Sequence, residues 1–193
     1  MAIPIPTPED VPLAVDRVEN GRASYALSKV AGEMLVHHGF SDEPDRFISA
    51  RFHNVYGPRM GSVHVVPELF LRMRGGERPM VISNALATRA FCFVDDAIRA
   101  VRHLMDSAPA GVYNVGNDAE EVRIGDLVRR IATVAGYDEA NLELDEVSEP
   151  PIPRRCPDIR KLRDTGFAPE IDLDEGIRRT LAWYDANDTP RGV

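Results

Sequence analysis

The chain has 193 residues, of which 44% are hydrophobic and 28% charged, enough apolar material for one globular domain or one and a half. Its formal net charge of −8 argues against nucleic acid as a partner, because an acidic protein is repelled by phosphate backbones. No apolar run approaches the ~20 residues that span a bilayer. The N-terminus also lacks the basic and apolar regions of a secretory signal, so a cytoplasmic protein without a membrane partner is expected.

The predicted elements alternate between helices and strands along the chain. Residues 1–21 are rich in proline and acidic residues and predict an irregular segment. Apolar residues at helical spacing then predict helices over 23–38, 66–73, 97–105, 124–135 and 173–184. Short apolar runs between turn residues predict strands at 47–52, 80–82, 90–94 and 111–115, with loops at 54–61 and 149–153. This alternation indicates an α/β fold.

Three smaller features have local interpretations. Asp95 and Asp96 precede a predicted helix, where carboxylates accept hydrogen bonds from free backbone N–H groups. Cys92 and Cys156 are too few for a disulfide framework and are expected to be a buried thiol and a loop thiol. Neither His53 nor His64 has a partner at metal-ligand spacing, so no metal site is expected.

The first candidate site is Tyr25-Ala-Leu-Ser-Lys29. Residues four apart lie on one face of a helix, so the two side chains are expected to be neighbours. An ammonium group beside a phenol stabilises the phenolate, which would make Tyr25 a proton donor or acceptor. The alternative is an ordinary surface pair on an amphipathic helix, because Y-x-x-x-K is common by chance.

The second candidate is Asn54, which lies where a predicted strand runs into a polar loop. Ligands of α/β proteins bind at strand ends, and an amide offers both a donor and an acceptor to a sugar or phosphate oxygen. The alternative is that Asn54 and Gly57 only shape a turn.

Arginines form the third and fourth candidates. Arg89 precedes the run Phe91-Cys-Phe-Val, and its planar fork of donors matches a phosphate group. Arg155 follows a proline-rich loop and is suited to hold a diphosphate with its neighbour. Asp158 would then accept from a ribose or sugar hydroxyl. The alternatives are solvent-facing arginines, and an Asp158 that caps the following helix.

These motifs occur in a characteristic order. Y-x-x-x-K is followed by R-F-x-N-x-Y-G-P-R, R-x-F-x-F-V-D-D, G-V-Y-N-V-G-N, R-R-x-P-D and a final E-G-I-R-R-T-L-A-W-Y segment. From about Ile3 to Tyr184 the chain resembles the extended short-chain dehydrogenase/reductase family, in particular its NAD-dependent nucleotide-sugar epimerases, dehydratases and decarboxylases.

The resemblance implies a role for each matching residue. Tyr25 would be the catalytic acid/base, and Lys29 would assist it and hold the nicotinamide ribose. Phe52 and His53 would, with these two, contact the cofactor, which is NAD, with NADP as the open alternative. The substrate, a nucleotide-diphosphate sugar, would be held by Asn54, Arg89, Arg155 and Asp158, and residues 65–70 would border the nucleobase.

The resemblance also implies an architecture. The chain is expected to be the back half of a Rossmann-type parallel sheet (residues 1–60 and 86–108), interleaved with a small α/β substrate-binding domain (61–85 and 109–193). It would begin about halfway through a family enzyme, after the glycine-rich turn and the catalytic Ser/Thr, and the full-length enzyme would be a homodimer. Ser83-Asn84-Ala85 departs from the family's G-D-G.

The reaction implied is transient oxidation of the sugar, followed by epimerisation, elimination or decarboxylation and return of the hydride. The residues present do not separate these three outcomes. Two other functions stay open: a non-catalytic nucleotide-sugar-binding or interaction module, and an NADP-dependent reductase on the same scaffold.

Overall fold

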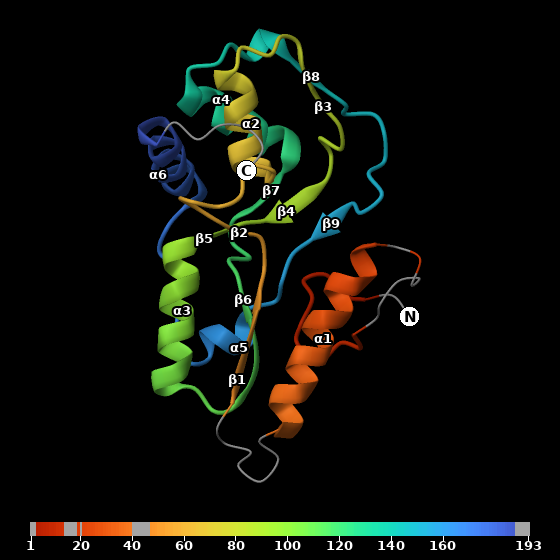
Figure 1. Ribbon diagram of the computed structural model, residues 1–193, viewed down its shortest axis with the longest axis vertical. Coiled ribbons are helices and arrows are strands. Elements are labelled where there is room, and N and C mark those ends of the chain that lie inside the picture. The colour runs from red at the N-terminus through yellow and green to blue at the C-terminus, as the bar shows by residue number, and fades with distance from the viewer. Residues whose placement is uncertain (1–2, 14–18, 20, 40–46, 188–193) are drawn as a thin grey trace.

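The computed structural model describes residues 3–13, 19, 21–39 and 47–187, which form helices and short, mostly parallel strands (Figure 1). The helices are α1 (Arg22–Gly39), α2 (Val65–Arg74), α3 (Val94–Ser107), α4 (Ile124–Ala135), α5 (Arg160–Arg163) and α6 (Leu173–Ala186). The strands are β1 (Ile48–Phe52), β2 (Val55–Tyr56), β3 (Met80–Ile82), β4 (Thr88–Ala90), β5 (Cys92–Phe93), β6 (Gly111–Val115), β7 (Glu121–Arg123), β8 (Leu142–Leu144) and β9 (Arg154–Arg155). A 3₁₀ turn, η2, spans Glu139–Asn141.

Each predicted helix is present, and the strands at 80–82 and 111–115 have the predicted bounds. Two predictions need correction. The strand expected at 90–94 is two strands, β4 and β5, because the chain changes partner at Phe91 and already begins α3 at Val94. The loop expected at 54–61 contains β2, which pairs in parallel with β5.

The first hydrophobic cluster surrounds the parallel pair of β1 and β6. This pair runs in register from Ile48 opposite Gly111 to Phe52 opposite Val115. Helices α3 and α5 pack against it and contribute Leu104 and Leu162, which are fully buried. Among the described residues, β1 pairs with β6 alone, so its other edge carries no strand.

The second hydrophobic cluster joins α2, α4 and α6 to β3 and β8 in the upper part of Figure 1. Helix α6 approaches β2 closely at Gly176. A Cβ at this position would lie 1.9 Å from Tyr56 Oη, so only glycine lets the helix reach the buried tyrosine ring. The expected division of the chain into two interleaved domains stays a prediction.

The local prediction for Asp95 and Asp96 is wrong in its hydrogen-bond partners. Asp96 accepts hydrogen bonds from the backbone N–H groups of Glu170 and Ile171, not from the start of its own helix. Asp95 lies 3.5 Å from the guanidinium of Arg179. Cys156 lies in the loop after β9, as expected of a loop thiol, and it is buried as well, beside the backbone hydrogen bond from Thr7 N to its carbonyl.

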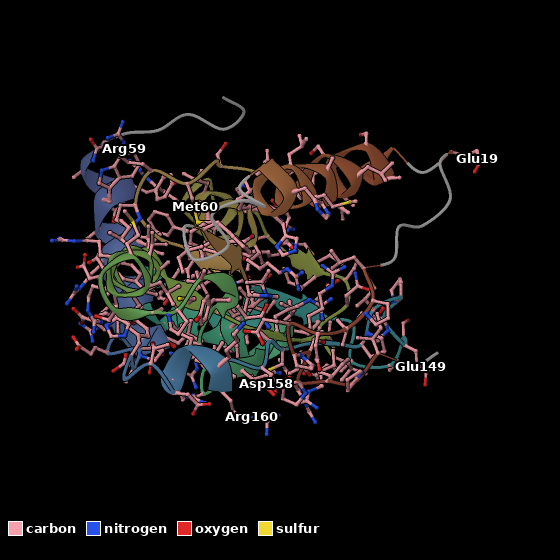
Figure 2. The ribbon with its side chains drawn as sticks, turned by 90° about the horizontal axis from the view of Figure 1, so that it is seen from below. Glu19, Arg59, Met60, Glu149, Asp158 and Arg160 are labelled. Carbon is pink, nitrogen blue, oxygen red and sulfur yellow. The ribbon has the colours of Figure 1, made fainter. Side chains whose placement is uncertain are left out.

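Helix α1 lies at the side of the molecule in both views (Figures 1 and 2). Its periodic apolar residues predicted the helix correctly, but they are not buried. Ala23 alone is buried among the α1 side chains that the structure describes, while Leu27, Met34 and Leu35 are 46%, 56% and 73% exposed. No helix in the described ranges combines the length and apolar character needed to cross a membrane.

Candidate functional site

An open groove of about 700 Å³ lies between α1 and β1. Tyr25, Lys29 and Phe52 line it, together with Ser28, Gly32, Glu33, Val36 and residues 48–51. The Nζ atom of Lys29 lies 5.2 Å from the centre of the Tyr25 ring, which is within the range of a cation–π contact. Tyr25 is 69% exposed, so its phenol is open to a ligand in the groove. The structure therefore brings together three of the four residues expected at the cofactor.

His53, the fourth of these residues, faces another part of the molecule. Its Nε2 atom lies 2.9 Å from Oδ1 of the buried Asn114 on β6. Burial lowers the pKa of His53, and the hydrogen bond to Asn114 only partly opposes this effect. The imidazole is not among the side chains that line the groove.

Asn54 lies in the two-residue link between β1 and β2, and it bonds to the chain at the end of β4 and the start of β5. Its backbone has a φ of 42°, a left-handed conformation that asparagine tolerates better than most residues. Its Nδ2 atom donates to the Ala90 carbonyl at 2.8 Å, and its own carbonyl accepts from Cys92 N at 3.3 Å. The turn interpretation thus has structural support, and the role toward a substrate stays a prediction.

Arg89 and Arg155 are direct neighbours in a three-stranded sheet of the order β7-β4-β9. Arg89 donates to the carbonyls of Thr88 at 2.7 Å and Ile152 at 2.9 Å. Burial, and then the adjacent charge of Arg155, lower the pKa of Arg89. In the part of the chain that the structure describes, no carboxylate pairs with either arginine. Two cations side by side make a site that an anion would stabilise.

Asp158 is held by a different arginine. Its carboxylate accepts from the backbone N–H of Arg160 at 2.9 Å and from the Arg160 guanidinium at 2.6 Å, and Figure 2 shows the two residues side by side. This hydrogen-bonded pair lowers the pKa of Asp158. Asp158 thus accepts from the first N–H of α5, although Ile159 occupies the N-cap position, and its role toward a substrate stays a prediction.

Two residues at this site have no role in the sequence-based assignment. Glu33 lies one turn after Lys29 on α1, and Arg51 lies on β1, where its guanidinium bonds to the Glu33 carboxylate in the groove. The spacing Tyr25, Lys29, Glu33 places three polar residues along one side of the helix, and this is the signal that would have identified Glu33. Within the described ranges, no three His, Cys, Asp or Glu side chains gather as metal ligands.

The fold and the Tyr–Lys groove define a Rossmann-type α/β protein with a polar site between a helix and a parallel strand. Residues 4–116 match the profile of the NAD dependent epimerase/dehydratase family, and the chain belongs to this family. It is 31% identical over 163 residues to a dTDP-glucose 4,6-dehydratase of Streptomyces griseus, covering 83% of this chain and 49% of the relative. It is also 31% identical over 166 residues to UDP-glucuronic acid decarboxylase 1 of Xenopus tropicalis, covering 84% and 39%. The chain spans about half the length of the curated relatives it matches.

Solved structures share the fold. WbmF of Bordetella bronchiseptica, in complex with NAD+ and UDP, has a TM-score of 0.74 at 27% identity, covering 90% of this chain and 55% of that one. RMD of Pseudomonas aeruginosa, complexed with NADPH, has a TM-score of 0.75 at 26% identity, covering 92% and 61%. UDP-glucose 4-epimerase of Thermotoga maritima, at 24% identity and a TM-score of 0.78 over 95% of this chain and 58% of its own, shows the fold alone. The prediction of an α/β fold containing part of a Rossmann-type sheet is confirmed.

Proposed function

We propose that this chain is the C-terminal part of an NAD-dependent nucleotide-sugar epimerase or dehydratase that acts by transient oxidation of the sugar. The observation that carries the proposal is the Tyr25–Lys29 pair on an open groove beside β1. Family membership supports it, because the named relatives include dehydratases and a decarboxylase of nucleotide sugars.

In this proposal Tyr25 and Lys29 handle the proton. Tyr25 Oη accepts the proton of a sugar hydroxyl when that carbon is oxidised, and it returns the proton when the carbonyl is reduced. The Lys29 ammonium stabilises the phenolate, which is the form of Tyr25 before the oxidation and again after the reduction, while the phenol carries the proton between the two steps. The exposure of the Tyr25 ring supports this role, since a proton-transfer group must be within hydrogen-bond reach of its substrate.

The groove fits one end of a dinucleotide. Lys29 offers ammonium donors to ribose hydroxyls, and Phe52, which is 58% exposed, offers an apolar surface to a nicotinamide ring. NAD, when bound, supplies the hydride acceptor for the oxidation and the hydride donor for the reduction. NADP is the alternative cofactor, and it is supported by the similar RMD structure, which was solved with NADPH.

Arg89 and Arg155 would hold the substrate's diphosphate. They are adjacent across β4 and β9, and the pKa of Arg89 is already lowered by burial and by its neighbour's charge. A diphosphate between the two guanidinium groups would compensate both charges through forked hydrogen bonds. The similar WbmF structure was solved with UDP, which is a nucleoside diphosphate and so contains the group that the two arginines would hold.

The proton-transfer role is tested by Tyr25→Phe in the enzyme that contains this chain. Turnover of a nucleotide sugar should fall by roughly 10²-fold or more, because the acid/base hydroxyl is lost, while nucleotide affinity stays unchanged. Tyr137→Phe is the matched control, since the Tyr137 hydroxyl donates to the Glu77 carbonyl and does not line the groove. Full turnover by the Tyr25→Phe enzyme would refute the assignment.

The diphosphate role is tested by calorimetric titration of Arg155→Ala with UDP and with dTDP. Binding should weaken by roughly 1.5–3 kcal/mol, the range for hydrogen bonds to charged groups. Arg130→Ala removes another exposed arginine, whose partner is Asp174, and it should leave the dissociation constants unchanged. Equal affinities of Arg155→Ala and the unsubstituted protein would remove this role from Arg155.

A further inference from the structure

Helix α1 has little apolar packing to fix its position. Of its side chains in the described part of the chain, Ala23 alone is buried, and its large apolar residues face solvent. Yet α1 carries Tyr25 and Lys29, whose use depends on where the helix lies relative to the rest of the site. The helix must therefore be held by other contacts.

The strongest of these contacts is a forked ion pair between α1 and β1. Arg51 Nε donates to Glu33 Oε2 at 2.9 Å, and Arg51 Nη2 donates to Glu33 Oε1 at 2.5 Å. Ser49 Oγ donates to the same carboxylate at 3.2 Å. The side chains of Arg51 and Glu33 are only 21% and 19% exposed, so water screens this pair less than a surface pair. The pair lowers the pKa of Glu33 and raises that of Arg51.

Arg51 also reaches the N-terminal segment. Its remaining nitrogen, Nη1, donates to the Glu9 carbonyl at 2.9 Å. The Glu9 carboxylate in turn accepts from the backbone N–H of the buried Asn114 at 2.8 Å. Residue 9 is thereby held by contacts with both strands of the β1–β6 pair, through Arg51 on β1 and Asn114 on β6.

The N-terminal segment also contacts the residues that follow Arg155 in the chain. Thr7 N donates to the Cys156 carbonyl, and Asp158 N donates to the Thr7 carbonyl, each at 2.9 Å. Asn114 Nδ2 closes the network by donating to the carbonyls of Thr7 and Asp158, each at 3.0 Å. Residues 7–9 thus link the segment that follows Arg155 to the Arg51 guanidinium, which also binds Glu33 on α1.

We propose that Arg51 is a positioning residue, which through Glu33 and the Glu9 carbonyl holds the Tyr25–Lys29 helix in a fixed place relative to Arg155. Glu33 lies two turns after Tyr25 on the same side of the helix. Anchoring Glu33 therefore fixes both the position of α1 along its axis and its rotation about that axis. The role rests on the proposed function, in which Tyr25 and Arg155 contact the same substrate. A guanidinium is required, because a lysine cannot make the fork and reach Glu9 at the same time.

The proposal is tested by electron–electron distance measurements on the full chain. Spin labels are placed at Leu35→Cys on α1 and Ile152→Cys beside β9, both solvent-exposed positions. The native thiols stay unlabelled, because burial raises the pKa of Cys92 to about 12 and of Cys156 to about 11. Dilution with unlabelled chain restricts the signal to distances within one molecule. The unsubstituted pair should give one narrow distribution.

Arg51→Lys should broaden this distribution about twofold or more, since it keeps the charge but loses the fork. Glu33→Gln should broaden it as well and provides a second variant if Arg51→Lys does not fold. The matched control is Arg72→Lys. Arg72 is also 21% exposed, also forks onto a carboxylate, that of Glu77, and also donates to a carbonyl, that of Val81. Its substitution should leave the distribution narrow.

Three results would overturn the proposal: a broad distribution in the unsubstituted chain, an unchanged one in Arg51→Lys and Glu33→Gln, or equal broadening in Arg72→Lys. The measurement uses neither cofactor nor substrate. Failure of the proposed function would appear as absent turnover or absent UDP binding, whereas failure of the positioning role would appear only in the distances.

Discussion

Asp95 and Asp96 are neighbours in the sequence, but their carboxylates have opposite environments. The Asp96 side chain is 1% exposed and accepts from Glu170 N, Ile171 N and the Arg99 guanidinium. The Asp95 side chain is 57% exposed and has one guanidinium at 3.5 Å. Asp96 thereby ties the start of α3 to the segment that leads into α6.

Asp96→Ala should lower the free energy of unfolding by about 2–4 kcal/mol, because two part-buried backbone N–H groups and a guanidinium lose the buried carboxylate that accepts from them. Asp95→Ala should lower it by less than about 0.5 kcal/mol, as expected of a solvent-exposed pair. Urea denaturation of both variants measures the difference. Equal losses would mean that the buried contacts of Asp96 do not stabilise the fold.

The partners of such residues explain what the sequence could not predict. A carboxylate before a helix predicts a local cap, whereas Asp96 bonds to Glu170, which is 74 residues away. The Glu33–Arg51 pair spans 18 residues and crosses from a helix to a strand. Tyr25 and Lys29, in contrast, meet because helical geometry alone brings residues four apart together. Sequence spacing therefore predicts the part of the site that lies within one helix.

The bounds of elements with a clear hydrophobic periodicity were predicted closely, and those of the short strands were not. Helix α4 has the predicted bounds, because Ile124, Leu127, Val128 and Ile131 form one apolar face that is buried apart from Ile124. Strands β7 and β9 have two or three residues, mostly charged, and exist through pairing with β4. A segment of that length carries no period, so its strand character depends on partners that are distant in the sequence.

Glycines in two helices should respond to alanine with opposite signs. At Gly176 in α6, a Cβ would lie 1.9 Å from Tyr56 Oη and 2.7 Å from its Cζ, so Gly176→Ala should destabilise the protein by about 1–3 kcal/mol through overpacking. At Gly32 in α1, a Cβ would meet no atom of the described chain within 4 Å, so Gly32→Ala should stabilise the helix by about 0.5–1 kcal/mol.

Thermal unfolding followed by circular dichroism distinguishes the two effects. The comparison is internal, because both substitutions add one methyl group to a helix. A stable Gly176→Ala variant would show that α6 can move away from Tyr56, and the close packing of these elements would then not determine the position of α6.

At the scale of the whole molecule, burial is uneven. One hydrophobic cluster packs against the β1–β6 pair, and the other joins α2, α4 and α6. In the described structure, α1 contributes to neither cluster, and the edge of β1 away from β6 pairs with no strand. Exposed apolar residues gather there, on α1 and at Phe52. Contiguous exposed apolar surface is the usual mark of an interface, and an unpaired strand edge favours association.

We therefore expect the 193-residue chain by itself to associate through α1. Sedimentation velocity over a wide concentration range should give masses above the 21.4 kDa of one chain. Leu35→Lys should shift the distribution toward the monomer, because it places a charge in the exposed apolar surface of α1. Val147→Lys, at a 91% exposed loop position away from α1, adds the same charge and should leave association unchanged. A chain that stays monomeric and unfolds cooperatively would show that α1 needs no partner, and the polar anchoring through Arg51 would then suffice to hold it.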